Sequence, residues 1–230
     1  MTNEDIRKKL FDAADEKYKS FSAKLVPGEN SIIGVRMPAI RKIAKEVSKT
    51  NYKEYLKAPF TLYHEECLLY GLVLGYIKTD IQTLLKEMDI WLDCVNNWAV
   101  CDSSIMNMKA LGKPENSDIV WKYVNEKIRF DKKPFTKRAM IVVLFSYYNN
   151  DIYIDRIINI YKSIYDENYY VKMALAWGLS VLATKRFDRV FQLLKNKELD
   201  RFIHNKTIQK CMESFRISTE QKQKIKKLKL

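Results

Sequence analysis

The segment from Asn96 to Ser104 carries side chains whose types and spacing could do chemistry. Trp98 and Asp102 are four residues apart, so in a helix the indole and the carboxylate would lie on one face, one turn apart. A structural interpretation is also open. Asp102 is followed by two serines and could cap a helix that begins at Ser103, with Trp98 packed beside the cap.

Two side chains further along the chain could join such a site. Arg138 borders the apolar stripe of an expected helix, where it either lies along a neighbouring helix or projects toward a phosphate or carboxylate. Trp177 lies within an apolar stripe, which favours a place in the core. Its neighbours are small, however, and this leaves room for one large aromatic ring to expose a face.

Metal and imidazole chemistry have few candidates in this chain. The four cysteines form no CxxC pair, so we expect buried thiols rather than bridges or zinc ligands at Cys67, Cys94, Cys101 and Cys211. The only histidines are His64 and His204. His64-Glu65-Glu66 lacks the second histidine of the HExxH motif, where Leu68 stands, and we interpret it as the start of a helix. We therefore predict no metal and no cofactor.

The charge of the chain indicates a polyanionic partner. Its 230 residues include 41 Lys and Arg against 28 Asp and Glu, a formal net charge of +13, and nucleic acid is the commonest polyanion. A lysine-rich surface that serves only solubility is the alternative. No apolar run is long enough to cross a membrane and the start lacks a signal peptide, so we expect a cytoplasmic, nucleoid-associated protein without a membrane partner.

Long apolar-periodic stretches with few glycines and prolines predict helices and no strands. The expected helices span residues 3–20, 38–49, 60–77, 81–94, 98–110, 115–127, 134–148, 151–164, 169–183, 186–195, 205–215 and 218–228. The stretch from Lys24 to Met37 contains Pro27, Gly28 and Gly34 and resists a helical interpretation. We expect it to be a loop that closes over something.

The expected helices repeat along the chain. A step of 35 residues superimposes Phe135 on Tyr170 and Lys137 on Lys172, and a similar step leads to Lys206. A period of about 35–40 residues with two helices per unit is typical of HEAT-like α-solenoids. We therefore predict an all-α fold, a right-handed α-solenoid of HEAT-like (ARM-type) repeats with a basic concave face, forming one domain over residues 1–230.

Several motifs together resemble the AlkD-type DNA alkylation repair glycosylases, over nearly the whole chain. They are Gly34-Val-Arg-Met-Pro38, Ile40-Arg-Lys-Ile-Ala-Lys45, Trp98-Ala-Val-Cys-Asp102, Lys137-Arg138-Ala139, Ala174-Leu-Ala-Trp177 and Asn205-Lys-Thr-Ile-Gln-Lys210. The resemblance implies HEAT-like repeats that wrap duplex DNA and hydrolyse the N-glycosidic bond of cationic N3- and N7-alkylated purines, such as 3-methyladenine and 7-methylguanine. It further implies that the base stays stacked and is approached from the backbone side.

The resemblance also implies roles for particular residues. Asp102 matches the catalytic carboxylate, Trp98 and Trp177 the aromatics beside the damaged nucleotide, and Arg138 the basic residue at the site. The family's tyrosine before the glycine loop has no clean match. Phe21 is nearest, but the loop between it and Gly34 differs in length.

The expected activity is that of a monofunctional glycosylase, because no lysine stands out as a Schiff-base nucleophile and the product would be an abasic site. Four lysines are candidate contacts to the duplex backbone, or else part of a solvated helix face: Lys137, Lys172, Lys206 and Lys210. The expected enzyme is a monomer acting on duplex DNA with alkylated purines. Two alternatives stay open: a catalytically silent DNA-structure binder on the same scaffold, and a HEAT-like scaffold for an acidic protein.

Overall fold

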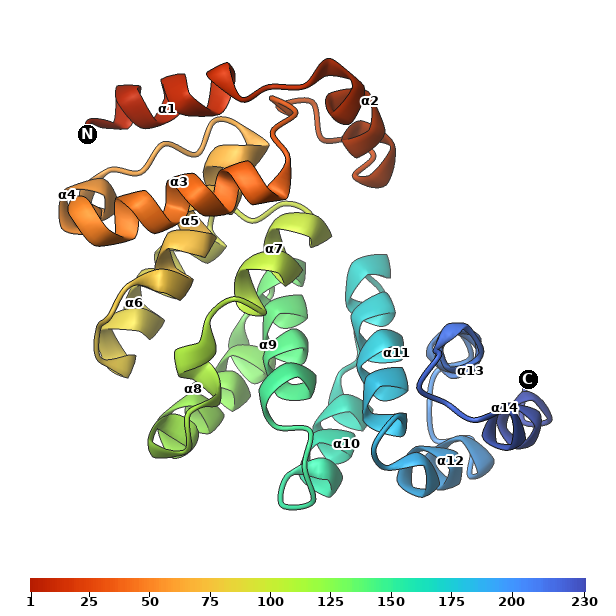
Figure 1. The fold of residues 1–230 in the computed structure, drawn as a ribbon. Helices are drawn as coiled ribbons and strands as arrows, with labels where there is room; N and C mark the ends of the chain where they lie inside the picture. Colours follow the sequence, from red (N-terminus) through yellow and green to blue (C-terminus); the bar gives the residue numbers. More distant parts are fainter. The chain divides into compact units, whose positions relative to one another are not determined.

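The chain is all-helical, as its sequence predicts. A computed structural model describes residues 1–230 and contains fourteen α-helices, two 3₁₀ helices and one isolated bridge between Ala14 and Val35 (Figure 1). The α-helices are α1 Asn3–Asp12, α2 Glu16–Leu25, α3 Met37–Thr50, α4 Tyr52–Lys57, α5 His64–Tyr76, α6 Ile81–Leu92, α7 Trp98–Ile105, α8 Ser117–Phe130, α9 Pro134–Tyr147, α10 Ile154–Ser163, α11 Tyr169–Ala183, α12 Phe187–Lys195, α13 Arg201–Glu213 and α14 Thr219–Lys226. The 3₁₀ helices, Lys109–Gly112 and Pro114–Asn116, follow α7. Every helix is too short or too polar to span a bilayer.

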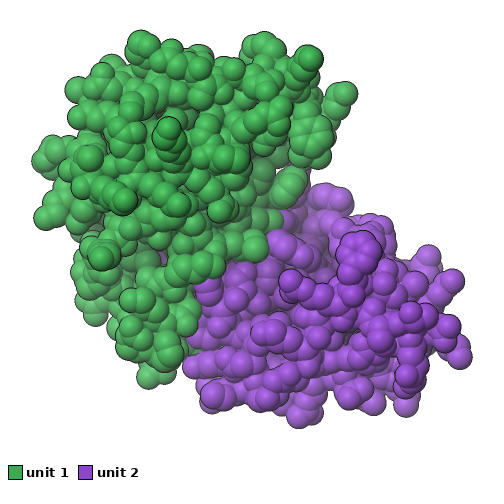
Figure 2. All heavy atoms as spheres, viewed as in Figure 1, with its two compact units in different colours: residues 1–122 green, residues 123–230 purple.

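The helices form two compact units, Met1–Lys122 and Tyr123–Leu230, shown in green and purple in Figure 2. We refer to them as unit 1 and unit 2. The single domain, the handedness of the solenoid and its basic concave face remain predictions.

The predicted repeat is visible in the spacing of one set of helices. Helices α5, α7, α9, α11 and α13 begin at residues 64, 98, 134, 169 and 201, which are 32 to 36 residues apart. Within unit 1, α5 packs against both α3 and α7, and within unit 2, α11 packs against both α9 and α13. Helices α6, α10, α12 and α14 pack against this set as a second layer. The sequence period of about 35 residues is therefore confirmed.

The two layers differ in how much of each helix is buried. In α5, α9 and α11 most residues are buried and Tyr169 is the only exposed one, so these helices have almost no solvated face. Helix α12 buries a single stripe, Phe187, Val190, Leu193 and Leu194, and apart from the half-buried Phe191 the rest of its surface is polar. Helices with one apolar stripe cover helices that are buried over most of their surface, and this burial is the main source of stability in a repeat array.

Some expected helix boundaries were wrong. The helix expected over residues 3–20 is two helices, because the Asp15 carboxylate accepts the Tyr18 N–H at 2.9 Å and starts α2. The Asp15 N–H leaves the helical pattern and donates to the Gly34 carbonyl at 3.0 Å. Helix α4 was not expected, and the helix expected from residue 60 begins at residue 64. Helix α13 begins earlier than expected because the Asp200 side chain caps it.

The cysteine expectation was half right. Cys101 and Cys211 are buried and form no disulfide, and burial raises the pKa of Cys211 to about 12. Cys67 on α5 and Cys94 after α6 instead form a disulfide, with Cα atoms 6.2 Å apart. Their 27-residue separation resembles no short cysteine motif, so only the packing of α5 against α6 brings them together.

Gly71 provides a test of the packing between α5 and α7. A Cβ atom there would lie 2.8 Å from the Trp91 ring and closer still to the Ser104 side chain. In an open helix Gly→Ala stabilises by about 1 kcal/mol. Here we expect Gly71→Ala to lower the free energy of unfolding by about 1–3 kcal/mol through overpacking, measured by urea denaturation.

Adding Ser104→Gly to the Gly71→Ala protein should recover part of the loss, since it removes the closest of these clashing atoms. A Gly71→Ala protein as stable as the wild type would show that α5 and α7 do not approach this closely.

Candidate active site

Helix α7 places Trp98 and Asp102 on one face. The helix begins at Trp98, and its cap is Asn97, whose side chain accepts the Val100 N–H at 3.0 Å. Asp102 therefore lies inside the helix, and the interpretation of Asp102 as a cap was wrong. The Asp102 side chain is buried, with the residue only 6% exposed, whereas Trp98 is half-buried. A carboxylate shielded from water in this way can act electrostatically at short range.

The loop between α2 and α3 holds the start of α7. The Trp98 indole N–H donates to the Leu25 carbonyl at 2.9 Å, across 73 residues of sequence. Leu25 is the last residue of α2, so the loop expected over Lys24–Met37 is present but shorter, between the end of α2 at Leu25 and the start of α3 at Met37. The contact between Trp98 and Leu25 ties the first residue of α7 to the end of α2.

One buried carboxylate fixes this loop in turn. Glu65, which is 2% exposed, accepts the backbone N–H groups of Ile33, Gly34 and Val35 at 2.8, 2.7 and 3.1 Å. Gly34 has φ +98°, and a Cβ there would meet the Lys19 side chain at 2.6 Å, so glycine is required. The His64-Glu65-Glu66 segment is the start of α5, as expected from the sequence.

A polar network links the same loop to the cap of α7. The Glu29 carboxylate accepts from the Asn96 amide at 2.8 Å and the Asn97 amide at 3.3 Å. Burial raises the pKa of Glu29, but hydrogen bonds from Ser31 and Asn96 outweigh it and leave the pKa below its usual value. Glu29 therefore stays charged at neutral pH and helps to hold the Asn96–Asn97 turn.

His64 completes this network in its neutral form. The side-chain oxygen of Asn97 already accepts the Val100 N–H. The side-chain NH₂ of Asn97 is therefore the group that faces His64 Nδ1, 3.1 Å away, and it must donate to that nitrogen. Burial lowers the pKa of His64 below its usual value, although the carboxylates of Glu65 and Glu29 oppose this. Protonation of His64 would place an N–H at Nδ1 opposite the N–H of the Asn97 side chain, and this would break the hydrogen bond between the two residues. Sequence reasoning missed this network; Asn97 directly before an apolar helix is the signal that could have revealed the cap.

Arg138 and Trp177 lie in unit 2, on neighbouring helices. Arg138 on α9 is 5% exposed, and its Nη1 donates to the Tyr170 carbonyl of α11 at 2.7 Å. Trp177 on α11 is half-buried and meets Phe145 edge to face, with ring centroids 4.6 Å apart. Trp177 is therefore not wholly in the core, and one part of its ring remains accessible.

The candidate DNA-binding lysines differ in their partners. Lys137 pairs with Asp166 at 2.6 Å, and Lys172 pairs with Glu167 at 2.7 Å and lies 3.9 Å from Asp200. The hydrogen bond that Lys172 donates to Glu167 is the main cause that raises the pKa of Lys172. Lys137 reaches the loop before α11, and Lys172 reaches the cap of α13, so both tie one repeat to the next.

Lys206 and Lys210 are held more loosely on α13. Lys206 donates to the Gln209 side chain at 2.8 Å, and Lys210 pairs with Glu213 at 2.8 Å within one helical turn. Such exposed pairs contribute about 0–1 kcal/mol, so a phosphate can replace them at little cost.

The net charge is concentrated in one unit. Unit 1 contains 18 Lys and Arg against 17 Asp and Glu, whereas unit 2 contains 23 against 11. Almost all of the net charge of +13 therefore belongs to unit 2, while the candidate carboxylate belongs to unit 1. Phe21, the weakest match, lies on α2 with its side chain 55% exposed and its ring 6.1 Å from Tyr18.

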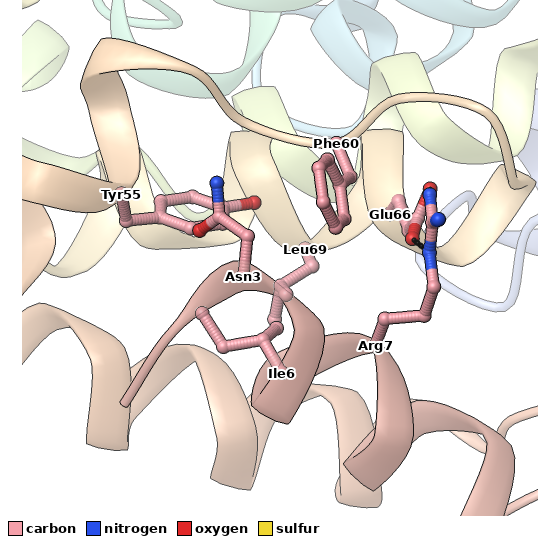
Figure 3. Close-up of a pocket in the computed structure, with 7 residues that line it drawn as sticks. All are labelled: Asn3, Ile6, Arg7, Tyr55, Phe60, Glu66 and Leu69. Atoms are coloured by element: carbon pink, nitrogen blue, oxygen red, sulfur yellow. Dashed lines mark hydrogen bonds and ion pairs between the residues drawn. The ribbon is translucent and has the colours of Figure 1, made fainter.

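The cavity in Figure 3 is too small to be a substrate-binding site. It lies between α1, α4 and α5, has a volume of about 10 Å³ and is lined in part by Tyr55, Phe60 and the Arg7–Glu66 ion pair. That is room for about one water molecule, beside a buried Tyr55 hydroxyl that has no hydrogen-bond partner. No group of three or more His, Cys, Asp or Glu side chains is placed to hold a metal ion.

The His64 contact predicts acid sensitivity of the α7 cap. Because burial lowers the folded-state pKa of His64, its stabilisation is complete above the unfolded value of about 6.5 and is lost as the pH falls below it. The urea midpoint of the wild type should fall from about pH 7.5 to about pH 5.5 by more than that of His64→Gln, whose side chain does not titrate. Equal falls in the two proteins would contradict this role for His64.

Comparison with known proteins identifies the family of the chain. The family model for DNA alkylation repair enzymes matches residues 6–214, a span that contains every candidate site residue. No curated protein and no solved structure matches the chain. Since the match covers most of the 230 residues, the chain belongs to the DNA alkylation repair enzyme family.

Proposed function

We propose that the protein is a monofunctional glycosylase that hydrolyses the N-glycosidic bond of cationic N3- and N7-alkylated purines in duplex DNA. The observation that carries the proposal is the buried Asp102 carboxylate one helical turn from Trp98, in a chain of the DNA alkylation repair family. The products are the free base and an abasic site. We further propose that the enzyme acts as a cytoplasmic, nucleoid-associated monomer.

The chemistry suits a site with one carboxylate. Alkylation at N3 or N7 leaves a positive charge on the purine, so the base departs as a neutral molecule and needs no general acid. As the bond from C1′ to nitrogen breaks, its electron pair neutralises the purine and positive charge develops on the sugar. Asp102 stabilises that charge and orients the water that attacks C1′, taking up the proton that the water loses.

The aromatic and basic side chains have supporting roles in this proposal. Trp98 and Trp177, each partly exposed, offer ring faces to the cationic nucleotide, and such contacts contribute about 0.5–2 kcal/mol. Arg138 holds a backbone phosphate near the lesion while its bond to the Tyr170 carbonyl keeps the guanidinium in place. The base remains stacked in the duplex and is approached from the backbone side.

The proposed backbone contacts divide according to their ion pairs. Lys206 and Lys210 can reach a phosphate by giving up weak contacts on their own helix. To bind a phosphate, Lys137 and Lys172 would have to give up ion pairs with carboxylates that join two repeats. Their contribution to DNA affinity is therefore smaller. Phosphate contacts of this kind position the duplex and carry no sequence information.

Asp102→Asn should abolish excision and leave duplex affinity equal or slightly higher, since it removes a negative charge near phosphates. We expect single-turnover release of 7-methylguanine and 3-methyladenine from methylated duplex DNA to slow by at least about a hundredfold, the scale of losing one electrostatic stabiliser of a transition state.

Asp118→Asn, a substitution of the same type at an exposed position of unit 1, is the matched control and should release base at the wild-type rate. Equal loss of binding and release in Asp102→Asn would mean that the carboxylate is structural. Tight binding with no release from the wild type would favour the catalytically silent DNA binder.

Salt dependence separates these two functions from a scaffold for an acidic protein. A protein that neutralises several phosphates loses affinity for duplex DNA with a linear slope of log K against log salt, about −0.9 per phosphate. We expect a steep slope for the wild type on undamaged duplex. A flat response would favour the protein scaffold.

A further inference from the structure

The last fifteen residues carry an unbalanced positive charge. Between Arg216 and the end of the chain there is a single acidic residue, Glu220, against six basic ones: Arg216, Lys222, Lys224, Lys226, Lys227 and Lys229. We call this stretch the C-terminal segment. It lies outside the family match, which ends at residue 214, so the family pattern does not account for it.

The C-terminal segment is fixed to α13 rather than loose. Ile225 of α14 is fully buried, and His204 lies in hydrogen-bond contact with the Leu228 carbonyl at 2.8 Å. The Asn205 side chain donates to the Leu230 carbonyl and accepts the Leu230 N–H, both at 2.9 Å. The basic side chains therefore project from a backbone with a defined place in unit 2.

Most of these cations have no acidic partner. Lys224 pairs with Glu220 at 2.7 Å, and no ion pair engages the remaining five. In helix α1, by contrast, each basic residue has an acidic partner: Arg7, Lys8 and Lys9 pair with Glu66, Asp12 and Glu46, respectively.

The positive charge of the C-terminal segment could serve solubility or the binding of a polyanion, and the comparison with α1 distinguishes these two explanations. The end of a repeat array needs a polar outer face to stay soluble. Helix α1 meets that need with nearly balanced charge, so solubility alone does not require the lysine excess of the C-terminal segment.

We propose that the C-terminal segment is a second DNA-contact surface, which binds the phosphate backbone of the duplex away from the damaged nucleotide. This inference rests on the proposed duplex substrate and adds a surface that contributes affinity but no chemistry. Each lysine that neutralises a phosphate releases a bound counterion, so the segment raises affinity most at low salt.

The test replaces Lys222, Lys226, Lys227 and Lys229 with Gln in the full chain. Binding to undamaged duplex DNA is measured by fluorescence anisotropy between about 0.05 and 0.3 M NaCl. If two or more of the lysines contact phosphates, the slope of log K against log salt should fall by about 2 or more. Affinity at about 0.1 M salt should fall at least about tenfold, and base release at saturating protein should keep its wild-type rate.

The matched control removes four exposed lysines from unit 1, Lys49, Lys53, Lys78 and Lys86, also to Gln. The two variants have the same net charge, so a C-terminal variant whose slope falls no more than that of the control overturns the proposal. Because undamaged DNA is the probe, that result is distinguishable from failure of the proposed glycosylase, which single-turnover release by the wild type and Asp102→Asn decides separately.

Discussion

The burial of the inner helices on nearly every side determines where charged side chains can occur in this protein. In α5, α9 and α11 almost no position faces solvent, so a charged side chain on them must find a partner inside the protein. The charged residues that do occur lie within the first five residues of their helices: Glu65 and Glu66 on α5, Lys137 and Arg138 on α9, and Lys172 on α11. Asp102 holds the same early position on the inner helix α7. Structural and proposed catalytic charges thus arise from one feature, the polar first turns of inner helices.

The first turn of α5 shows how such a charge organises the candidate site. Glu65 satisfies three backbone N–H groups of a loop that has no helix or strand to bond to, and this removes a cost of about 1–3 kcal/mol for each unsatisfied group. The loop so held begins directly after Leu25, whose carbonyl accepts the Trp98 indole N–H, and it contributes Glu29 to the cap of α7. The place of Asp102 therefore depends on residues more than thirty positions earlier in the chain.

The sequence predicted local features well and contacts between distant residues poorly. The 35-residue period and the common face of Trp98 and Asp102 follow from helix geometry, which depends on neighbouring residues only. The break at Asp15 and the disulfide of Cys67 with Cys94 depend on contacts with distant segments. The sequence predicted a basic residue of the repeat at position 137. It did not predict that Lys137 would pair with Asp166 and so link two repeats. Periodicity shows which face a side chain occupies and does not show what it meets there.

The two histidines bear on the proposed substrate class. His64 is neutral and accepts the Asn97 amide N–H at the α7 cap, and His204 is fully buried beside the Leu228 carbonyl, so both imidazoles have structural partners. A neutral purine must be protonated before it can leave, and the proposed Asp102 carboxylate, ionised when it acts, does not supply that proton. A purine that is already cationic removes the requirement. The residue types of the proposed site thus favour cationic N3- and N7-alkylated purines over neutral lesions.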